Sequence, residues 1–228
     1  MQRIVAGNRP IGTFGEIRKL LGEPVPRLAD LNQVPPQIAA MFTRGGVLER
    51  IRRKLAAISG KRGRAILPAH QTIAAVDEED NLYVGVEFLA ACQGNEDVIA
   101  GILAHEWGHL VSELPRGIDW SHLTWEELFA LRREEEAAAD AFAGRALFLL
   151  GYDVEQLTRF FARLERQRAT GMAKRLLGQS PKYHATPVRI AILRQAFAAQ
   201  QRTADSARKL FPGATYRHPG TTKLLGAG

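Results

Sequence analysis

Cysteine is nearly absent from this chain of 228 residues, because Cys92 is the only one. A single cysteine cannot form an intramolecular disulfide, and it cannot supply the group of thiolates that holds a structural zinc ion. Histidine is scarce as well, with six in the whole chain. Any metal site in this protein therefore has to combine a few histidines with carboxylates.

Long apolar segments are missing too. No run approaches the roughly 20 consecutive apolar residues that a helix needs to cross a bilayer. The first residues, 1–7, include one arginine but lack the apolar stretch, roughly 7 to 15 residues long, of a secretory signal. We therefore expect a soluble, cytoplasmic protein.

Acidic residues are fewer than basic ones, with 24 Asp and Glu against 31 Lys and Arg, and the formal net charge is +7. Such an excess attracts anionic surfaces, so we expect peripheral contact with acidic membrane surfaces. The densest basic stretches are residues 50–64 and 159–174. No recognisable pattern of aromatic and basic residues for base stacking and no zinc-finger spacing occurs, so no specific nucleic-acid partner is expected.

The most informative segment that is present reads His-Glu-Trp-Gly-His at residues 105–109. Residues four apart lie on the same face of a helix, so His105 and His109 can both reach one metal ion. Glu106 stands beside them, where a carboxylate can take a proton from a metal-bound water. This spelling is a zinc-hydrolase signature.

The surroundings of the motif favour a helix. Asn95 is suited to cap a helix whose first turn carries Glu96 and Asp97, and Pro115 lies beyond its end. Apolar residues follow at near-helical spacing from Val98 onward. The motif is therefore predicted to lie on a helix, as the two-histidine geometry requires.

Catalytic zinc normally has three protein ligands and one open position, so a further ligand is expected downstream. Glu136 is the best candidate. It lies on a second predicted helix, which the capping box of Thr124 and Glu127 begins and Gly151 ends. Asp140 is four residues further on the same face, where it can accept the free ring N–H of a liganding histidine.

The run of glutamates 134–136 has a plainer interpretation, a solvated face paired with Arg132 and Arg133. That interpretation fits Glu134 and Glu135 better than Glu136. Glu136 and Asp140 are surrounded by alanines, which let two helices pack closely, and carboxylates in such a setting require partners.

The motif at residues 105–109, followed by Glu136-x-x-x-Asp140, resembles the gluzincin metallopeptidases of the HtpX and CAAX prenyl endopeptidase type. Residues 81–86, a predicted strand that leads into a short helix, are similar to that family's approach to its active-site helix. His184 and the later pair Arg189-Ile190 resemble its His-Pro…Arg-Ile segment. The resemblance covers roughly residues 68–195.

The resemblance implies that Glu106 is the general base and that His105, His109 and Glu136 bind one zinc ion per chain. It implies that Asp140 contacts a liganding histidine. It also implies that His184 acts in catalysis, or that the neighbouring Tyr183 donates a hydrogen bond to the tetrahedral intermediate, as an oxyanion stabiliser would.

The expected fold is α+β and mainly helical, a zincin-like catalytic domain over residues 46–212 with a small sheet beside the active-site helix. Residues 1–45 are expected to form a proline-rich arm, and residues 213–228 a flexible tail. Strands are predicted at 65–68, 72–76 and 82–86, and an amphipathic helix at 47–59. Further helices are predicted to begin after Asp153 and at Thr186. His70 and His122 are expected to be loop residues and not ligands.

The function predicted from these patterns is that of a zinc-dependent metalloendopeptidase, with a peptide or protein as substrate. Two other interpretations stay open. In one, the protein is latent or regulatory, and the N-terminal arm or the tail with His218 fills the cleft. In the other, it is a non-catalytic basic binding module that carries the motif by chance.

Overall fold

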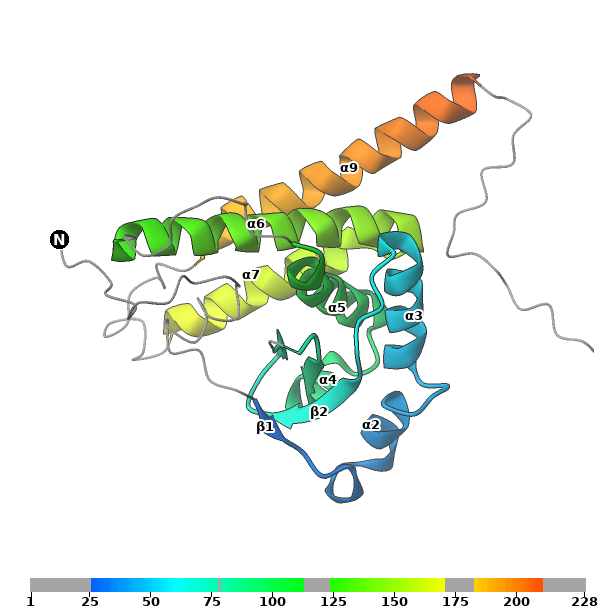
Figure 1. Ribbon diagram of the computed structural model, residues 1–228, viewed down its shortest axis with the longest axis vertical. Coiled ribbons are helices and arrows are strands. Elements are labelled where there is room, and N and C mark those ends of the chain that lie inside the picture. Colours follow the sequence, from blue (N-terminus) through cyan, green and yellow to red (C-terminus); the bar gives the residue numbers. More distant parts are fainter. Residues whose placement is uncertain (1–25, 78, 113–123, 171–182, 211–228) are drawn as a thin grey trace, which may run out of the picture.

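The structure is a computed structural model that describes residues 26–77, 79–112, 124–170 and 183–210. Most of these residues are helical, and four short strands form one small mixed sheet. The fold class is therefore α+β, as the sequence predicts. Figure 1 shows the sheet on one side of a central helix, while the long helices of the C-terminal half lie on the other.

The sheet contains β1 (Arg27–Leu28), β2 (Ile66–His70), β3 (Ala74–Val76) and β4 (Leu82–Gly85), in the order β1-β2-β4-β3. The inner pair β2 and β4 is parallel, and each edge strand pairs antiparallel with its neighbour. All residues of β4 are buried, as expected for an inner strand whose two faces are both covered. The strand predictions are confirmed to within about two residues.

The N-terminal part of the described chain belongs to the fold. Besides β1, it includes a 3₁₀ turn, η1 (Leu31–Gln33), and a short helix, α2 (Pro36–Met41). Ala29 and Ile38 are buried in the core. Residues 26–45 of the predicted arm thus take part in the sheet and the core. The rest of that arm and the predicted tail lie outside the described residues.

Helix α3 (Val47–Ser59) has the predicted bounds. Leu48, Ile51 and Leu55 point into the core and are fully buried. The helix ends at Gly60, whose positive φ of 71° is a left-handed conformation that glycine adopts without strain. The apolar stripe of this basic segment therefore packs on the core.

Two further helices follow the sheet, α4 (Val86–Cys92) and α5 (Glu96–Val111). The side chain of Asn95 accepts a hydrogen bond of 3.2 Å from the backbone N–H of Val98, which is the predicted cap. The histidine motif is thus helical. Helix α5 contacts α3, α4, α6, α7 and β3 and is the central element of the fold.

The remaining helices are α6 (Trp125–Leu150), α7 (Val154–Thr170) and α9 (Thr186–Leu210). The capping box of Thr124 and Glu127 is present, and α6 ends at Gly151 in a left-handed conformation, both as predicted. Helix α9 packs against α6 and extends past it (Figure 1).

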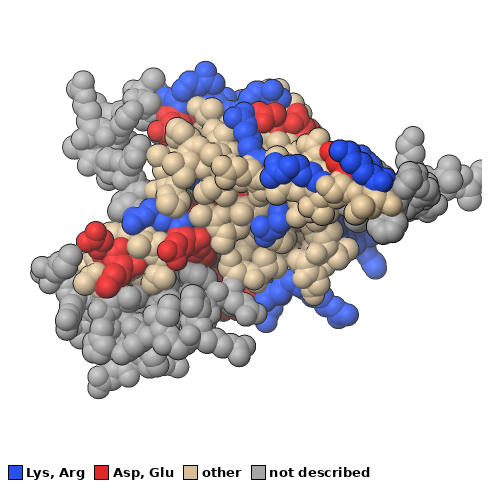
Figure 2. All heavy atoms as spheres, turned by 90° about the horizontal axis from the view of Figure 1, so that it is seen from above, with Lys and Arg blue, Asp and Glu red and all other residues tan. Residues whose placement is uncertain are grey.

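The described surface is mixed in charge. In the view from above, Lys and Arg side chains occur in several separate groups, with Asp and Glu between some of them (Figure 2). The positive charge on this face is therefore distributed over several elements. Within the described ranges, no helix combines the length and apolar composition that spanning a membrane requires.

Candidate metal centre

Helices α5 and α6 bring together the three side chains that the sequence predicts as metal ligands. One donor atom from each of His105, His109 and Glu136 lies within 4.8 Å of the other two. All three side chains are buried, with exposed fractions of 9% for His105, 3% for His109 and 2% for Glu136. The group is therefore a buried two-histidine, one-carboxylate cluster that could hold a metal ion.

The Nε2 atoms of both histidines face the same carboxylate. Nε2 of His105 lies 3.2 Å from Oε2 of Glu136, and Nε2 of His109 lies 3.6 Å from Oε1. The two imidazole rings are nearly perpendicular, with their centroids 4.9 Å apart. Nitrogen and oxygen donors converging in this way are the ligand types that zinc uses in proteins.

A close approach of the two helices makes this convergence possible. A Cβ atom added to Gly108 would lie 2.6 Å from Cα and 3.0 Å from Cβ of Ala139. Glycine on α5 and alanine on α6 therefore let the two backbones nearly touch, one residue before His109 and three residues after Glu136. Ala139, one of the alanines noted in the sequence around Glu136, thus has this packing role.

Asp140 lies behind His105, on the side away from Glu136. Its Oδ1 atom is 2.9 Å from Nδ1 of His105. From α9, Arg189 donates two hydrogen bonds of 2.8 Å to the two carboxylate oxygens of Asp140. The guanidinium of Arg189 also lies 4.7 Å from the ring centre of Phe161 and 5.5 Å from that of Tyr183. Three helices thus contribute to the surroundings of His105.

The electrostatic balance of the metal-free centre follows from these contacts. Burial disfavours the charged imidazole of His105, but Asp140 and Glu136 outweigh it and raise its pKa to about 10. Burial also acts against ionisation of the two carboxyl groups. His109, His105 and Arg132 nevertheless hold the pKa of Glu136 well below its usual value, and Arg189 and His105 lower that of Asp140. Both carboxylates are therefore charged at neutral pH.

Within the part of the chain that the structure describes, three buried side-chain atoms lack an aligned hydrogen bond, and all three belong to the cluster: Nδ1 of His105, Nδ1 of His109 and Oε2 of Glu136. The short distances to their neighbours are thus contacts of charge without the directionality of a good hydrogen bond. Buried polar atoms are normally satisfied, so such a concentration calls for an explanation. A cation bound between the two Nε2 atoms and Glu136 would supply the missing partner of Oε2, and the donor set fits one.

Glu135 corrects the interpretation of the glutamate run. We predicted it on the solvated face together with Glu134, but only Glu134 is exposed. Glu135 is fully buried, and its Oε1 atom lies 2.8 Å from Nδ1 of His109. A partial signal was available in the helical phase, because Glu135 is four residues before Ala139, one of the alanines expected where the two helices pack closely.

Arg132 is the second buried residue that sequence reasoning assigned to the surface. Its Nη1 atom contacts Oε2 of Glu135, and its Nη2 atom lies 2.8 Å from Oε1 of Glu136. Only 4% of its side chain is exposed. Arginine is rarely buried unless it is paired with a negative charge. The burial of Arg132 could therefore be predicted only by first recognising that its partners, Glu135 and Glu136, are buried on the same face of α6.

The predicted catalytic residues lie at different positions relative to the three cluster residues. Glu106 is half-buried on α5, next to His105. His184 is half-buried just before α9, and within the described part of the chain it makes no hydrogen bond or ion pair with the three cluster residues. The ring of Tyr183 faces the guanidinium of Arg189, which in turn binds Asp140.

His70 stands apart from the cluster. His70 was expected in a loop but is the last residue of β2, where its Nδ1 atom lies 2.7 Å from a carboxylate oxygen of Glu87. It is not part of the cluster. His122 and His218 lie outside the described residues.

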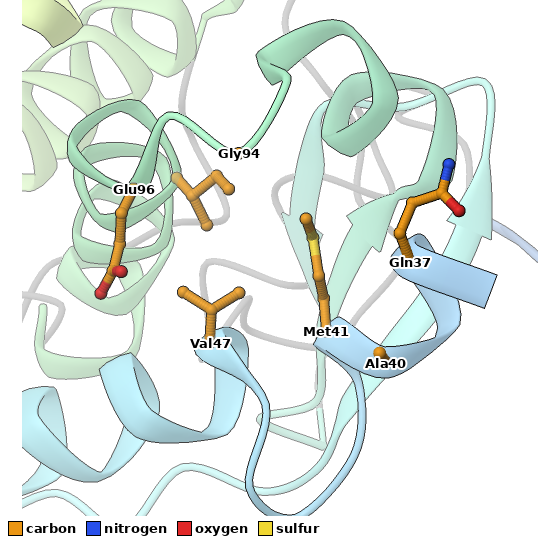
Figure 3. Close-up of a pocket in the computed structure, with 7 residues that line it drawn as sticks. Gln37, Ala40, Met41, Val47, Gly94 and Glu96 are labelled. Atoms are coloured by element: carbon orange, nitrogen blue, oxygen red, sulfur yellow. The ribbon is translucent and has the colours of Figure 1, made fainter. Parts of the chain in front are cut away.

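A hollow of about 260 Å³ opens at the other end of α5, between α2, α3 and the first turn of α5 (Figure 3). Its lining is mostly apolar and includes Met41, Val47 and Ile99, with Glu96 at its rim. None of its lining residues belongs to the metal cluster. The hollow is therefore distinct from the candidate centre.

Comparison with known proteins gives no indication of the function. No model of a known protein family matches the chain, and no curated protein matches its sequence. The motif, the cluster and its charge balance are thus the observations from which a function can be argued.

Proposed function

We propose that this chain is a zinc-dependent metalloendopeptidase in which His105, His109 and Glu136 hold the zinc ion. The observation that carries the proposal is the convergence of these three buried donors from two separate helices. A chance motif on a binding module would have no reason to meet a buried carboxylate on another helix. Three protein ligands with one open position are typical of catalytic zinc, whereas structural zinc usually has four.

The resemblance to gluzincins supports the same assignment, because it names the same three ligands and the same base. A zincin-like arrangement of the catalytic domain is part of the proposal. It is supported by the position of the sheet, since β3 and the motif helix α5 are in contact. The identity of the metal rests on the donor types, because imidazole and carboxylate in this ratio suit zinc.

In this mechanism Glu106 is the proton carrier. A bound zinc ion would supply a Lewis acid for the scissile carbonyl and lower the pKa of a water molecule to about 7. Glu106 takes the proton of the attacking water and delivers it to the leaving amine, so it serves as base and then as acid. Asp140, held by Arg189, keeps the ring of His105 oriented. His184 and Tyr183 are proposed only as donors to the developing oxyanion.

A peptide substrate is consistent with the sheet. Within the described residues β3 is an edge strand, because β4 is the one strand with which it pairs. Because β3 contacts α5, a peptide that extended the sheet along this edge would run past the motif helix. Main-chain pairing of this kind holds extended peptides with little dependence on their sequence.

Replacing Glu106 by Gln tests the chemical role. The variant should keep its zinc, because Glu106 is not a ligand, and lose peptide hydrolysis by at least about 100-fold. Metal content and cleavage of a peptide library should be measured on the same purified sample. Intact hydrolysis by the variant would show that Glu106 is not the base.

Replacing Glu136 by Ala tests the ligand set, with Glu134→Ala as the matched control on the exposed face of the same helix. The Glu136 variant should lose stoichiometric zinc, while the control should retain it. Equal zinc content in both variants would point to another third ligand. Wild-type protein that binds no zinc at all would favour the basic binding module instead.

A further inference from the structure

We propose that Glu135 and Arg132 are positioning residues for His109, forming a carboxylate and arginine pair that orients the second zinc ligand. This inference rests on the proposed function, because it assigns a role toward the same metal centre. It concerns two residues of α6 that neither the motif nor the resemblance singles out.

The geometry consists of three consecutive contacts. Nδ1 of His109 lies 2.8 Å from Oε1 of Glu135. The other carboxylate oxygen of Glu135 contacts Nη1 of Arg132, and Nη2 of the same guanidinium lies 2.8 Å from Oε1 of Glu136. All of these side chains are almost completely shielded from solvent, so each contact acts in a medium of low dielectric constant.

The contact to Nδ1 determines which nitrogen of His109 is available to a metal. A neutral imidazole carries its proton on one nitrogen, and the other nitrogen offers a lone pair. The contact is not aligned as a hydrogen bond, but the negative charge of a carboxylate 2.8 Å from Nδ1 still favours the proton on that atom and leaves the Nε2 lone pair directed to Glu136. Glu135 therefore selects the tautomer of His109 that can bind the metal.

The arrangement repeats, at the second histidine, what Asp140 and Arg189 provide at the first. In both cases a carboxylate stands at Nδ1 and an arginine neutralises that carboxylate. The two differ in origin, because Arg189 comes from α9 whereas Arg132 lies on α6 with Glu135 and Glu136. Arg132 thus couples the positioning carboxylate to the proposed third ligand within one helix.

A purely structural ion pair is a poor explanation for these residues. Burying charged groups costs several kcal/mol each, and apolar residues of similar size are often at least as stabilising. Glu134, the preceding residue, shows where a glutamate on α6 lies when it needs no partner, because it is exposed. A buried charge at position 135 is therefore best explained by what it does to His109.

The test is metal binding by the full chain, read without any activity assay. Metal-depleted wild type, Glu135→Ala, Glu135→Gln and the control Glu134→Gln should be titrated with zinc against a chelator and loaded with cobalt for absorption spectra. We expect Glu135→Ala to weaken zinc binding by about 10- to 100-fold and to change the cobalt spectrum. Glu135→Gln, which keeps an oxygen acceptor, should lose less affinity, and Glu134→Gln should match wild type.

The outcomes separate the two proposals. Wild type that binds neither zinc nor cobalt overturns the metal centre itself and this inference with it. Wild type that binds metal, together with a folded Glu135→Ala variant of equal affinity and identical cobalt spectrum, overturns the role of Glu135 alone. Should the alanine variant not fold, Glu135→Gln decides, and an unchanged affinity and spectrum would again contradict the proposal.

Discussion

Asp77 shows how much a single side chain organises in this protein. Its carboxylate accepts hydrogen bonds from the backbone N–H groups of Glu79 and Asn81, both at 2.9 Å. It also accepts one from the Asn81 side chain at 2.9 Å and one from the Tyr83 hydroxyl at 2.8 Å. These donors close the turn between β3 and β4 and so hold the edge strand that lies beside α5.

The contribution of Asp77 to stability depends on pH, because its pKa in the folded protein is lowered. Burial alone would raise the pKa of Asp77, but the hydrogen bonds from Asn81 and Tyr83 outweigh it, and the net pKa is lowered. A lowered folded-state pKa means that ionised Asp77 stabilises the fold above about pH 4. That contribution is lost as the pH falls through the folded-state value.

We therefore predict that Asp77→Asn lowers the free energy of unfolding by about 1–2 kcal/mol at pH 6 and by less at pH 3. Urea unfolding of both proteins at the two pH values measures this difference. In the wild type, burial and Asp77 raise the pKa of Tyr83 to about 12, so ultraviolet titration of the variant should show it lowered. A stability difference that does not change with pH would contradict the assignment.

At the scale of elements, the contact between α5 and α6 decides whether the donors meet. Gly108 permits this contact, because any side chain there would collide with the α6 backbone at Ala139. Gly101 has a comparable position on α5 but faces α7, where a Cβ atom added to it would lie 2.7 Å from the side chain of Leu157. The two glycines thus separate the effect of overpacking from the effect of moving α6.

We predict that Gly108→Ala and Gly101→Ala each destabilise the fold by about 1–3 kcal/mol through overpacking. Only Gly108→Ala should also weaken zinc binding, because it moves Glu136 away from the two histidines. Thermal unfolding without metal and zinc titration against a chelator measure the two effects. Equal zinc affinity in the two variants would mean that the centre tolerates a shift of α6.

At the scale of the whole molecule, the metal-free state has its own charge compensation. Arg132 pairs with Glu136, and Arg189 pairs with Asp140, so the buried carboxylates have cationic partners without a metal. The hydrophobic core extends from α2 and α3 to α9 and does not depend on the cluster. The protein should therefore stay folded when its metal is removed.

We predict that chelation leaves the helical circular dichroism unchanged and lowers the midpoint of thermal unfolding. Zinc at about 100 times its dissociation constant should add about 2.7 kcal/mol, which is a rise of roughly 5–10 °C for a chain of this size. Calorimetry with zinc and with chelator measures the difference, and Glu136→Ala should show none. Complete unfolding on chelation would instead indicate a structural zinc.

Local signals account for what the sequence predicted well. The caps at Asn95 and Thr124, the glycine at 151 and the bounds of α3 all depend on residues within a few positions of one another. The three candidate ligands were found in the same way, from spacings of four residues on two helices. Helix periodicity converts such spacings directly into faces, so no tertiary information was needed.

Which residues pack against each helix face was decided only by the tertiary structure. Glu135 was misplaced because three consecutive glutamates cannot all face solvent or all face α5, and the packing angle of α6 determines which of them are buried. The order of the strands, the entry of β1 into the sheet and the side chains that approach His109 depend on contacts distant in sequence. The chain by itself therefore determined the helices and the candidate donors, whereas close packing of α5 on α6 decided that these donors meet and which charges surround them.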